Sequence, residues 1–122
     1  MSMARRWTPS VLWGTLILVA TSIPGSALPL ASGFPGVDKL VHLFLYGMLG
    51  ALIWRAQQQP LWSTFWWTVA GIALFAGLDE WHQQFVPGRS MELADWMADV
   101  SGATLGIVLL TVTALRRRET PT

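Results

Sequence analysis

The sequence predicts an all-α membrane protein, a polytopic bundle of four transmembrane helices. Of its 122 residues, 52% are hydrophobic and only 12% are charged, which is about half the charged share of an average soluble domain. Eight tryptophans accompany a single tyrosine, and tryptophan is enriched where a membrane meets water. Four apolar segments show the length of spanning helices and none of the two-residue alternation of barrel strands.

The four segments form a single predicted domain, residues 1–122, because the chain is too short for two. The first segment ends at Pro24-Gly25, and the second follows a loop rich in proline, glycine and serine. The third is uncharged until Asp79, and the fourth ends at a run of three arginines. The predicted helices cover residues 8–23, 37–55, 61–84 and 93–115.

Basic residues near the segment ends predict the orientation, because cytoplasmic flanks carry an excess of lysine and arginine. If the chain crosses four times, six arginines lie at the end that also holds both termini: Arg5, Arg6, Arg55, Arg116, Arg117 and Arg118. We therefore expect the N- and C-termini in the cytoplasm and loops 24–37 and 85–92 outside. The outer end then carries two bases and six acids: Lys39, Arg89, Asp38, Asp79, Glu80, Glu92, Asp95 and Asp99.

The first segment has an alternative interpretation as a signal peptide. Arg5-Arg6 would be its charged start, and Gly25-Ser26-Ala27 is a passable cleavage site. Cleavage would leave three helices in the same orientation.

Polar residues recur at helical spacing near the outer ends of the last three helices. Asp99 would lie roughly 9 Å below the start of its helix at Leu93, at 1.5 Å per residue. A carboxylate at that depth is costly unless it is paired or solvated. We therefore expect the polar faces to meet in one pocket that opens to the outside. The candidate catalytic residues are His42, Asp79, Glu80, His82, Asp95 and Asp99, and the candidate ligand-binding residues are Lys39, His42, Gln83 and Arg89.

A structural interpretation of the same residues stays open. The acids could pair with Arg89, Lys39 and the histidines only to lock the bundle together. Tyr46 is interpreted as structural, and most tryptophans are interpreted as interface anchors.

Two short motifs predict how the helices meet. Gly102 and Gly106 form a small-xxx-small pattern that lets another helix approach closely. The segment Val86-Pro87-Gly88-Arg89-Ser90 predicts a tight turn that ends the third helix. Its arginine could fold back over the acids or point at an anion, and its planar fork could engage two carboxylates.

Several classes of site are excluded or weak. The absence of cysteine excludes disulfides and thiolate metal sites. No cofactor and no defined metal site are predicted, although a divalent cation is possible. With mostly oxygen donors, magnesium, calcium or manganese would suit better than zinc. There is no glycine-rich phosphate loop for a nucleotide, and the only basic runs are short helix flanks, which argues against nucleic acid.

The motif Asp38-Lys39-Leu-Val-His42-Leu-Phe-Leu-Tyr46 is followed by Asp79-Glu80-x-x-Gln83-x-Phe85-x-Pro87-Gly88-Arg89 and by Asp95-x-x-x-Asp99-x-x-Gly102. Over about two thirds of the chain this pattern resembles the VanZ-like family of small bacterial membrane proteins. The family often has asparagine where this chain has Asp99. The resemblance implies a multi-pass protein of the bacterial cytoplasmic (inner) membrane, in a family linked to glycopeptide (teicoplanin) resistance. For this short chain we expect a role in the cell envelope rather than resistance itself.

Two alternative functions are considered for the outer site. In the first, it binds a lipid-linked or cell-wall-related anionic headgroup, with Arg89 and Lys39 on its phosphate or carboxylate. The partners would be membrane lipids or a lipid-linked envelope precursor. The alternative is a membrane-embedded hydrolase or transferase, in which His42 or His82 acts as base or nucleophile beside one of the carboxylates. A proton- or cation-coupled carrier is disfavoured, because the inner halves of the predicted helices carry no charged side chain.

Overall fold

The computed structural model describes residues 1–27, 36–58 and 60–119, so most of the first predicted outer loop lies outside the described residues. The described residues form four α-helices and one 3-10 turn, with no strand among them, which confirms the all-α prediction. The elements are α1 (Met3–Thr21), η1 (Gly25–Ala27), α2 (Val37–Ala56), α3 (Trp62–Gln83) and α4 (Leu93–Glu119).

Two helices are longer than the sequence pattern predicts. Helix α1 begins at Met3, five residues before the apolar segment, where the Ser2 hydroxyl accepts a hydrogen bond from the backbone N–H of Arg5. A serine at this position caps the free N–H groups of the first turn. Helix α4 continues to Glu119 through the three arginines. Arginine is a good helix former, and its charge is favourable at a helix C-terminus, so this run extends the helix instead of ending it.

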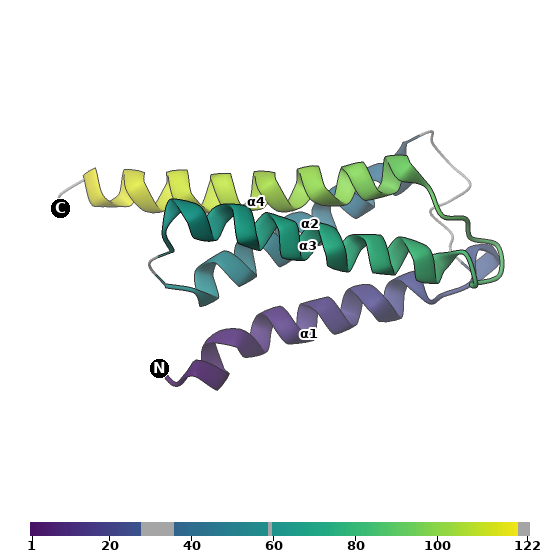
Figure 1. Ribbon diagram of the computed structural model, residues 1–122, viewed down its shortest axis with the longest axis horizontal. Helices are drawn as coiled ribbons and strands as arrows, with labels where there is room; N and C mark the ends of the chain where they lie inside the picture. Colours follow the sequence, from purple (N-terminus) through teal and green to yellow (C-terminus); the bar gives the residue numbers. More distant parts are fainter. Residues whose placement is uncertain (28–35, 59, 120–122) are drawn as a thin grey trace.

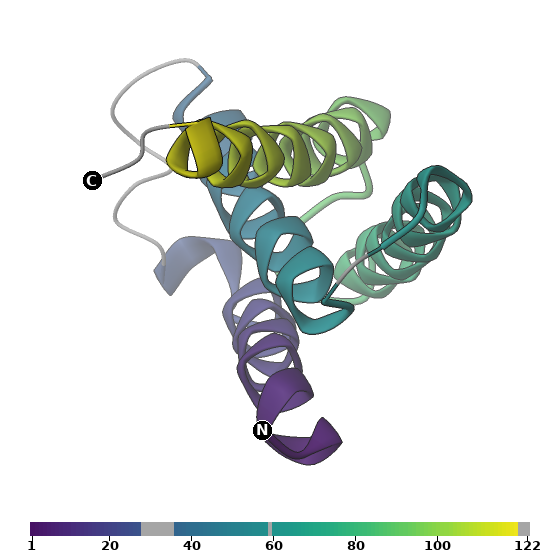
Figure 2. The ribbon, with the colours of Figure 1, turned by 90° about the vertical axis from the view of Figure 1, so that its left-hand side faces the viewer.

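The helices lie roughly along one long axis, and the N- and C-termini lie at the same end of the molecule (Figure 1). Viewed along that axis, α2 lies between the other three helices (Figure 2). Helix α2 contacts each of them and packs most extensively against α4. The buried apolar core lies at this centre and includes Ile17, Tyr46, Leu49, Ile72, Ala76 and Ala103.

Glycines bring α2 and α4 into backbone contact. A Cβ added at Gly106 would overlap the backbone of Gly47, and one at Gly102 would overlap the backbone of Leu43. From the other side, a Cβ at Gly50 would lie 2.5 Å from the backbone oxygen of Ala103. The predicted close approach at the two glycines of α4 is therefore confirmed, and α2 is the helix that they meet.

Helices α2 and α4 are long and apolar enough to cross a membrane by length and composition. Large apolar side chains also point outward from every helix. Leu12, Phe44, Trp67 and Leu109, one from each helix, are all more than half exposed. A surface of this kind suits lipid better than water. Together these features indicate a membrane protein.

The connection between α3 and α4 is the predicted tight turn. Gly88 has a φ of 74°, in the left-handed region that glycine adopts without strain. The backbone N–H of Arg89 donates to the carbonyl of Val86 at 3.1 Å, and the carbonyl of Pro87 accepts from the N–H of Gly25 at 2.9 Å. This second bond ties the turn to η1, so the end of α1 and the end of α3 lie side by side.

Candidate functional site

Buried charged side chains gather at the end of the bundle where α3 ends and α2 and α4 begin. Asp79 and Glu80 come from the last turns of α3, and Asp95 and Asp99 come from the first turns of α4. These four carboxyl groups belong to residues that are at most 6% exposed, and His42 on α2 is 7% exposed. Charges buried in this way are stable only with partners. The contacts of each group therefore define the site.

His42 lies at the centre of the cluster and contacts three acids. Its Nδ1 lies 2.7 Å from Oδ1 of Asp99 and 3.9 Å from Oε1 of Glu80. Its Nε2 lies 3.8 Å from Oδ2 of Asp95. We call the four residues His42, Glu80, Asp95 and Asp99 the His42 cluster. Three helices contribute to it, so the polar faces of α2, α3 and α4 do meet.

Asp79 has its own set of partners, next to the His42 cluster. Its Oδ2 accepts a hydrogen bond from the Tyr46 hydroxyl at 2.9 Å, and its Oδ1 accepts one from the Thr21 hydroxyl at 2.6 Å. Each carboxylate oxygen is therefore satisfied by a hydroxyl from a different helix. This arrangement joins α1, α2 and α3 at the level of the site.

Lys39 lies above the cluster and contacts three acids. Its Nζ lies 2.8 Å from Asp38, 2.6 Å from Glu92 and 2.6 Å from Asp95. The hydrogen bond from Lys39 holds the pKa of Glu92, which precedes α4, below its usual range. Through Asp95, which Lys39 and His42 both contact, the exposed ion pairs and the buried His42 cluster form one continuous network.

Arg89 does not engage carboxylates as the sequence suggested. Its Nε donates to the carbonyl of Ile23 at 2.7 Å and its Nη2 to the carbonyl of Ala20 at 3.1 Å. Its Nη1 lies 3.3 Å from Oε1 of Gln83. Ala20 lies in the last turn of α1 and Ile23 lies two residues beyond its end, where carbonyls carry partial negative charge, which explains their attraction for a guanidinium. Within the described part of the chain, Arg89 thus joins the end of α1 to the α3–α4 turn, and its one link to an acid passes through Gln83 to Glu80.

Gln83 takes part in the contacts of the site, whereas His82, its neighbour on α3, does not. Gln83 is buried, and its Nε2 donates to Oε1 of Glu80 at 3.2 Å. The other oxygen of Glu80 accepts from the backbone N–H of Glu92 at 3.1 Å. His82 is outside the contacts that hold His42, and its Nδ1 is buried without a partner among the described residues.

Sequence reasoning does not connect two hydroxyl donors to the site. Tyr46 is predicted to be structural, and its hydrogen bond to the buried carboxylate of Asp79 fits that role. Thr21 has no predicted role, although it is a polar residue at the C-terminal end of the first helix. The sequence feature that could have indicated its role is its place at the end of an apolar segment. Only the docking of α1 against α3 shows which acid it contacts.

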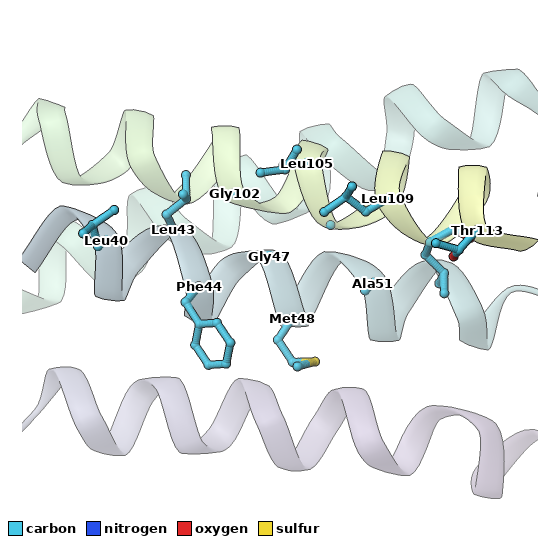
Figure 3. A pocket seen from close by; sticks show the side chains of 12 residues that line it. Leu40, Leu43, Phe44, Gly47, Met48, Ala51, Gly102, Leu105, Leu109 and Thr113 are labelled. Atoms are coloured by element: carbon cyan, nitrogen blue, oxygen red, sulfur yellow. The ribbon is translucent and has the colours of Figure 1, made fainter. Parts of the chain in front are cut away.

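An open apolar groove of about 450 Å³ lies between α2 and α4 (Figure 3). Leu40 and Leu43 line one end of the groove (Figure 3), and in α2 Leu40 directly follows Lys39 and Leu43 directly follows His42. The groove then passes Gly47 and reaches the second half of α4 at Leu109 and Thr113. The polar site and this groove are therefore adjacent on the same two helices.

Two groups of side chains in the described residues have ligand atoms close enough to hold a metal ion. In the first, one atom each from His42, Glu80 and Asp99 lie within 4.8 Å of one another, and all three residues are buried. In the second, Asp38, Glu92 and Asp95 meet the same distance criterion, but two of them are exposed. Lys39 contacts all three members of that second group and supplies the positive charge there.

Comparison with known proteins supports the resemblance seen in the motifs. A family model described as VanZ/LLP1 matches residues 3–114. No curated protein and no solved structure matches the chain significantly.

Proposed function

Because the chain belongs to the VanZ/LLP1 family, we propose that it is a cell-envelope protein that binds an anionic headgroup at the polar end of its helix bundle. The ligand is a membrane lipid or a lipid-linked envelope precursor. The apolar groove between α2 and α4 holds the tail of that ligand, and the residues around Arg89 hold its head.

The proposal places the protein in the bacterial cytoplasmic membrane with four crossings. Both termini lie at one end of the bundle, together with the arginines of α1 and α4 (Figure 1). The excess of arginine favours the cytoplasm for this end. The His42 cluster, Lys39 and Arg89 then face the outside, where envelope precursors are used.

The observation that carries the proposal is the position of the groove, which lies on the same two helices as the polar site and begins on α2 at Leu40 and Leu43, next to Lys39 and His42 in the chain. From Leu40 to Ala51, helix α2 rises about 16 Å at 1.5 Å per residue, and both residues line the groove. An acyl or isoprenyl chain in the groove would therefore run along half of the bundle, with its polar head at the end of the bundle where Lys39 and Arg89 both lie. Amphipathic ligands bind where an apolar channel ends at a few polar groups.

Arg89 is better suited than Lys39 to contact the headgroup directly. Lys39 already contacts three carboxylates, which offset its charge. Arg89 uses three of the five N–H donors of a guanidinium on Gln83 and on the carbonyls of Ala20 and Ile23. Two donors remain among the described contacts, and its positive charge is not offset by a contacting acid. A phosphate or carboxylate would pair with this group.

The alternative function, a membrane-embedded hydrolase or transferase that uses the same residues, is not favoured by the family match. Nothing in the geometry of the site requires it.

Binding can be measured on the purified full-length protein in mild detergent by native mass spectrometry. Phosphatidylglycerol and undecaprenyl phosphate are the anionic probes, and phosphatidylcholine is the neutral probe. We expect the anionic probes to bind in preference, and Arg89→Lys to weaken them at least several-fold, because lysine cannot present two parallel donors. Arg55→Lys, at the opposite end of α2, is the matched control and should bind as the wild type does.

The role of the groove is tested by Ala51→Phe, which places an aromatic ring in the groove between α2 and α4. This variant should weaken binding of every long-chain probe, whereas Arg89→Lys should affect only the anionic ones. Thermal stability in detergent without added lipid shows whether each variant is folded. If folded Arg89→Lys binds the anionic probes as tightly as the wild type, the proposed headgroup contact is wrong.

A further inference from the structure

We propose that His42, Glu80 and Asp99 form a binding site for one divalent transition-metal ion. One ligand atom from each residue lies within 4.8 Å of the other two. The three come from α2, α3 and α4, so a metal at this point would join three of the four helices. A set of one imidazole and two carboxylates leaves further coordination positions for water or a ligand.

Asp99 supplies the observation that points to a missing partner. The residue is 0% exposed. Its Oδ1 contacts Nδ1 of His42 at 2.7 Å, but its Oδ2 is buried without any hydrogen-bond partner among the described residues. A buried carboxylate oxygen without a partner is unfavourable, and more so when the group is ionised. A cation bound by this carboxylate would remove the cost.

The Oδ2 of Asp99 differs in this respect from both oxygens of Asp79, both oxygens of Glu80 and Oδ1 of Asp95. Both oxygens of Asp79 accept hydrogen bonds from hydroxyls. Both oxygens of Glu80 accept hydrogen bonds, from Gln83 and from the backbone of Glu92. Oδ1 of Asp95 lies 2.6 Å from Nζ of Lys39, so this ion pair satisfies it. The unpartnered oxygen therefore belongs to a proposed metal ligand.

The charge balance around His42 also favours a dication. Three acids lie within 4 Å of its ring: Glu80, Asp95 and Asp99. Against them stand the imidazole itself and Lys39, which is shared with two exposed acids. A buried excess of negative charge is unfavourable in a medium of low dielectric constant. A divalent ion supplies two positive charges at the point where these carboxylates converge.

The orientation of the imidazole agrees with a role as ligand. Its Nδ1 faces Glu80 and Asp99, while its Nε2 faces Oδ2 of Asp95 at 3.8 Å. A carboxylate on the far side of a metal-binding histidine holds the proton on the outer nitrogen and raises the basicity of the inner one. Asp95 lies on that side of the ring, but at 3.8 Å it is beyond hydrogen-bond distance and would act on Nε2 through its charge. The imidazole favours manganese or zinc over calcium, which prefers a shell of oxygens.

This inference does not depend on lipid binding, and it has its own test. Full-length protein in detergent is stripped with a chelator, and Mn²⁺, Zn²⁺ and Mg²⁺ are titrated separately by calorimetry, with metal content measured by mass spectrometry. We expect one Mn²⁺ or Zn²⁺ per chain. His42→Gln and Asp99→Asn should each weaken binding more than about tenfold, since loss of even an outer partner of a metal ligand costs 10–100-fold.

Two controls separate this site from its neighbours. His82→Gln removes the other histidine, which does not contact the cluster, and should leave binding unchanged. Glu92→Gln removes a carboxylate of the second candidate group (Asp38, Glu92 and Asp95), keeps the backbone N–H that binds Glu80, and should also leave metal binding unchanged. Circular dichroism of the metal-free variants shows whether they are folded. Because these variants alter buried groups, X-ray absorption of the zinc-loaded wild type gives a second readout, with one imidazole nitrogen and the remaining ligands oxygen.

If the wild type does not bind one metal ion per chain, the inference is overturned. Binding that survives His42→Gln and Asp99→Asn also overturns it. Binding that is lost in Glu92→Gln alone does so too, because the ion would then occupy the group formed by Asp38, Glu92 and Asp95. A zinc spectrum with no imidazole ligand leads to the same conclusion.

Discussion

Replacing Gly106 by alanine should destabilise the bundle, although alanine is the better helix former. In an exposed helix position the change from glycine to alanine stabilises by up to about 1 kcal/mol. At Gly106 the new Cβ would overlap backbone atoms of Gly47 on α2, and a backbone cannot rotate away as a side chain can. Helices α2 and α4 must then separate, and overpacking of this kind costs about 1–3 kcal/mol. The expected net effect is a loss of up to about 2 kcal/mol, as the difference of these two values.

Gly71 on α3 provides the matched control. It is exposed, and a Cβ built there meets nothing within 4 Å. Gly71→Ala should therefore leave the protein as stable as the wild type or slightly more so. The measurement is thermal unfolding in detergent, followed by circular dichroism. The packing argument is refuted if Gly106→Ala raises the melting temperature as Gly71→Ala does, because the glycine would then not support a helix contact.

Two further predictions concern polar contacts near the site. Tyr46→Phe keeps the buried ring but removes the donor to Asp79, and it should cost about 1–3 kcal/mol, the usual penalty for a buried acceptor that loses its partner; an unchanged melting temperature would contradict this contact. Lys39 depresses the pKa of Glu92 in the folded protein, so this pair contributes stability above the unfolded pKa of 4.5 and loses it as the pH falls below that value through the folded pKa. Thermal unfolding between pH 7 and pH 3, a range spanning the usual carboxyl pKa values, should show a smaller acid-induced loss in Glu92→Gln than in the wild type.

The sequence predicts the helices well because their signals are local. Apolar runs, the turn at Gly88 and the small residues of α4 are all visible without knowledge of the fold. The meeting of polar faces on three helices also follows from local spacing, since carboxylates at such depth must leave the lipid. The ends of α1 and α4 were placed less accurately, because Ser2 and the terminal arginines extend helices beyond the apolar residues.

The partners of individual side chains were not predictable in the same way. Arg89 was expected to engage carboxylates, but it contacts the carbonyls of Ala20 and Ile23 instead. These carbonyls lie at and just beyond the end of α1, where backbone groups are left without helical partners. They lie close to Arg89 because the carbonyl of Pro87 accepts a hydrogen bond from the N–H of Gly25. Such a pairing depends on how α1 docks. The same docking decides that Thr21 contacts Asp79.

The burial of charge at the site depends on the close packing of α2 against α4. Gly102 lies one turn after Asp99 and packs on the backbone of Leu43, the residue that follows His42. The distance of 2.7 Å between His42 and Asp99 therefore depends on a glycine at position 102. Asp79 depends instead on hydroxyls from α1 and α2 and on no glycine contact with α4. Separation of α2 from α4 should consequently break the His42 cluster first and leave the partners of Asp79 in place.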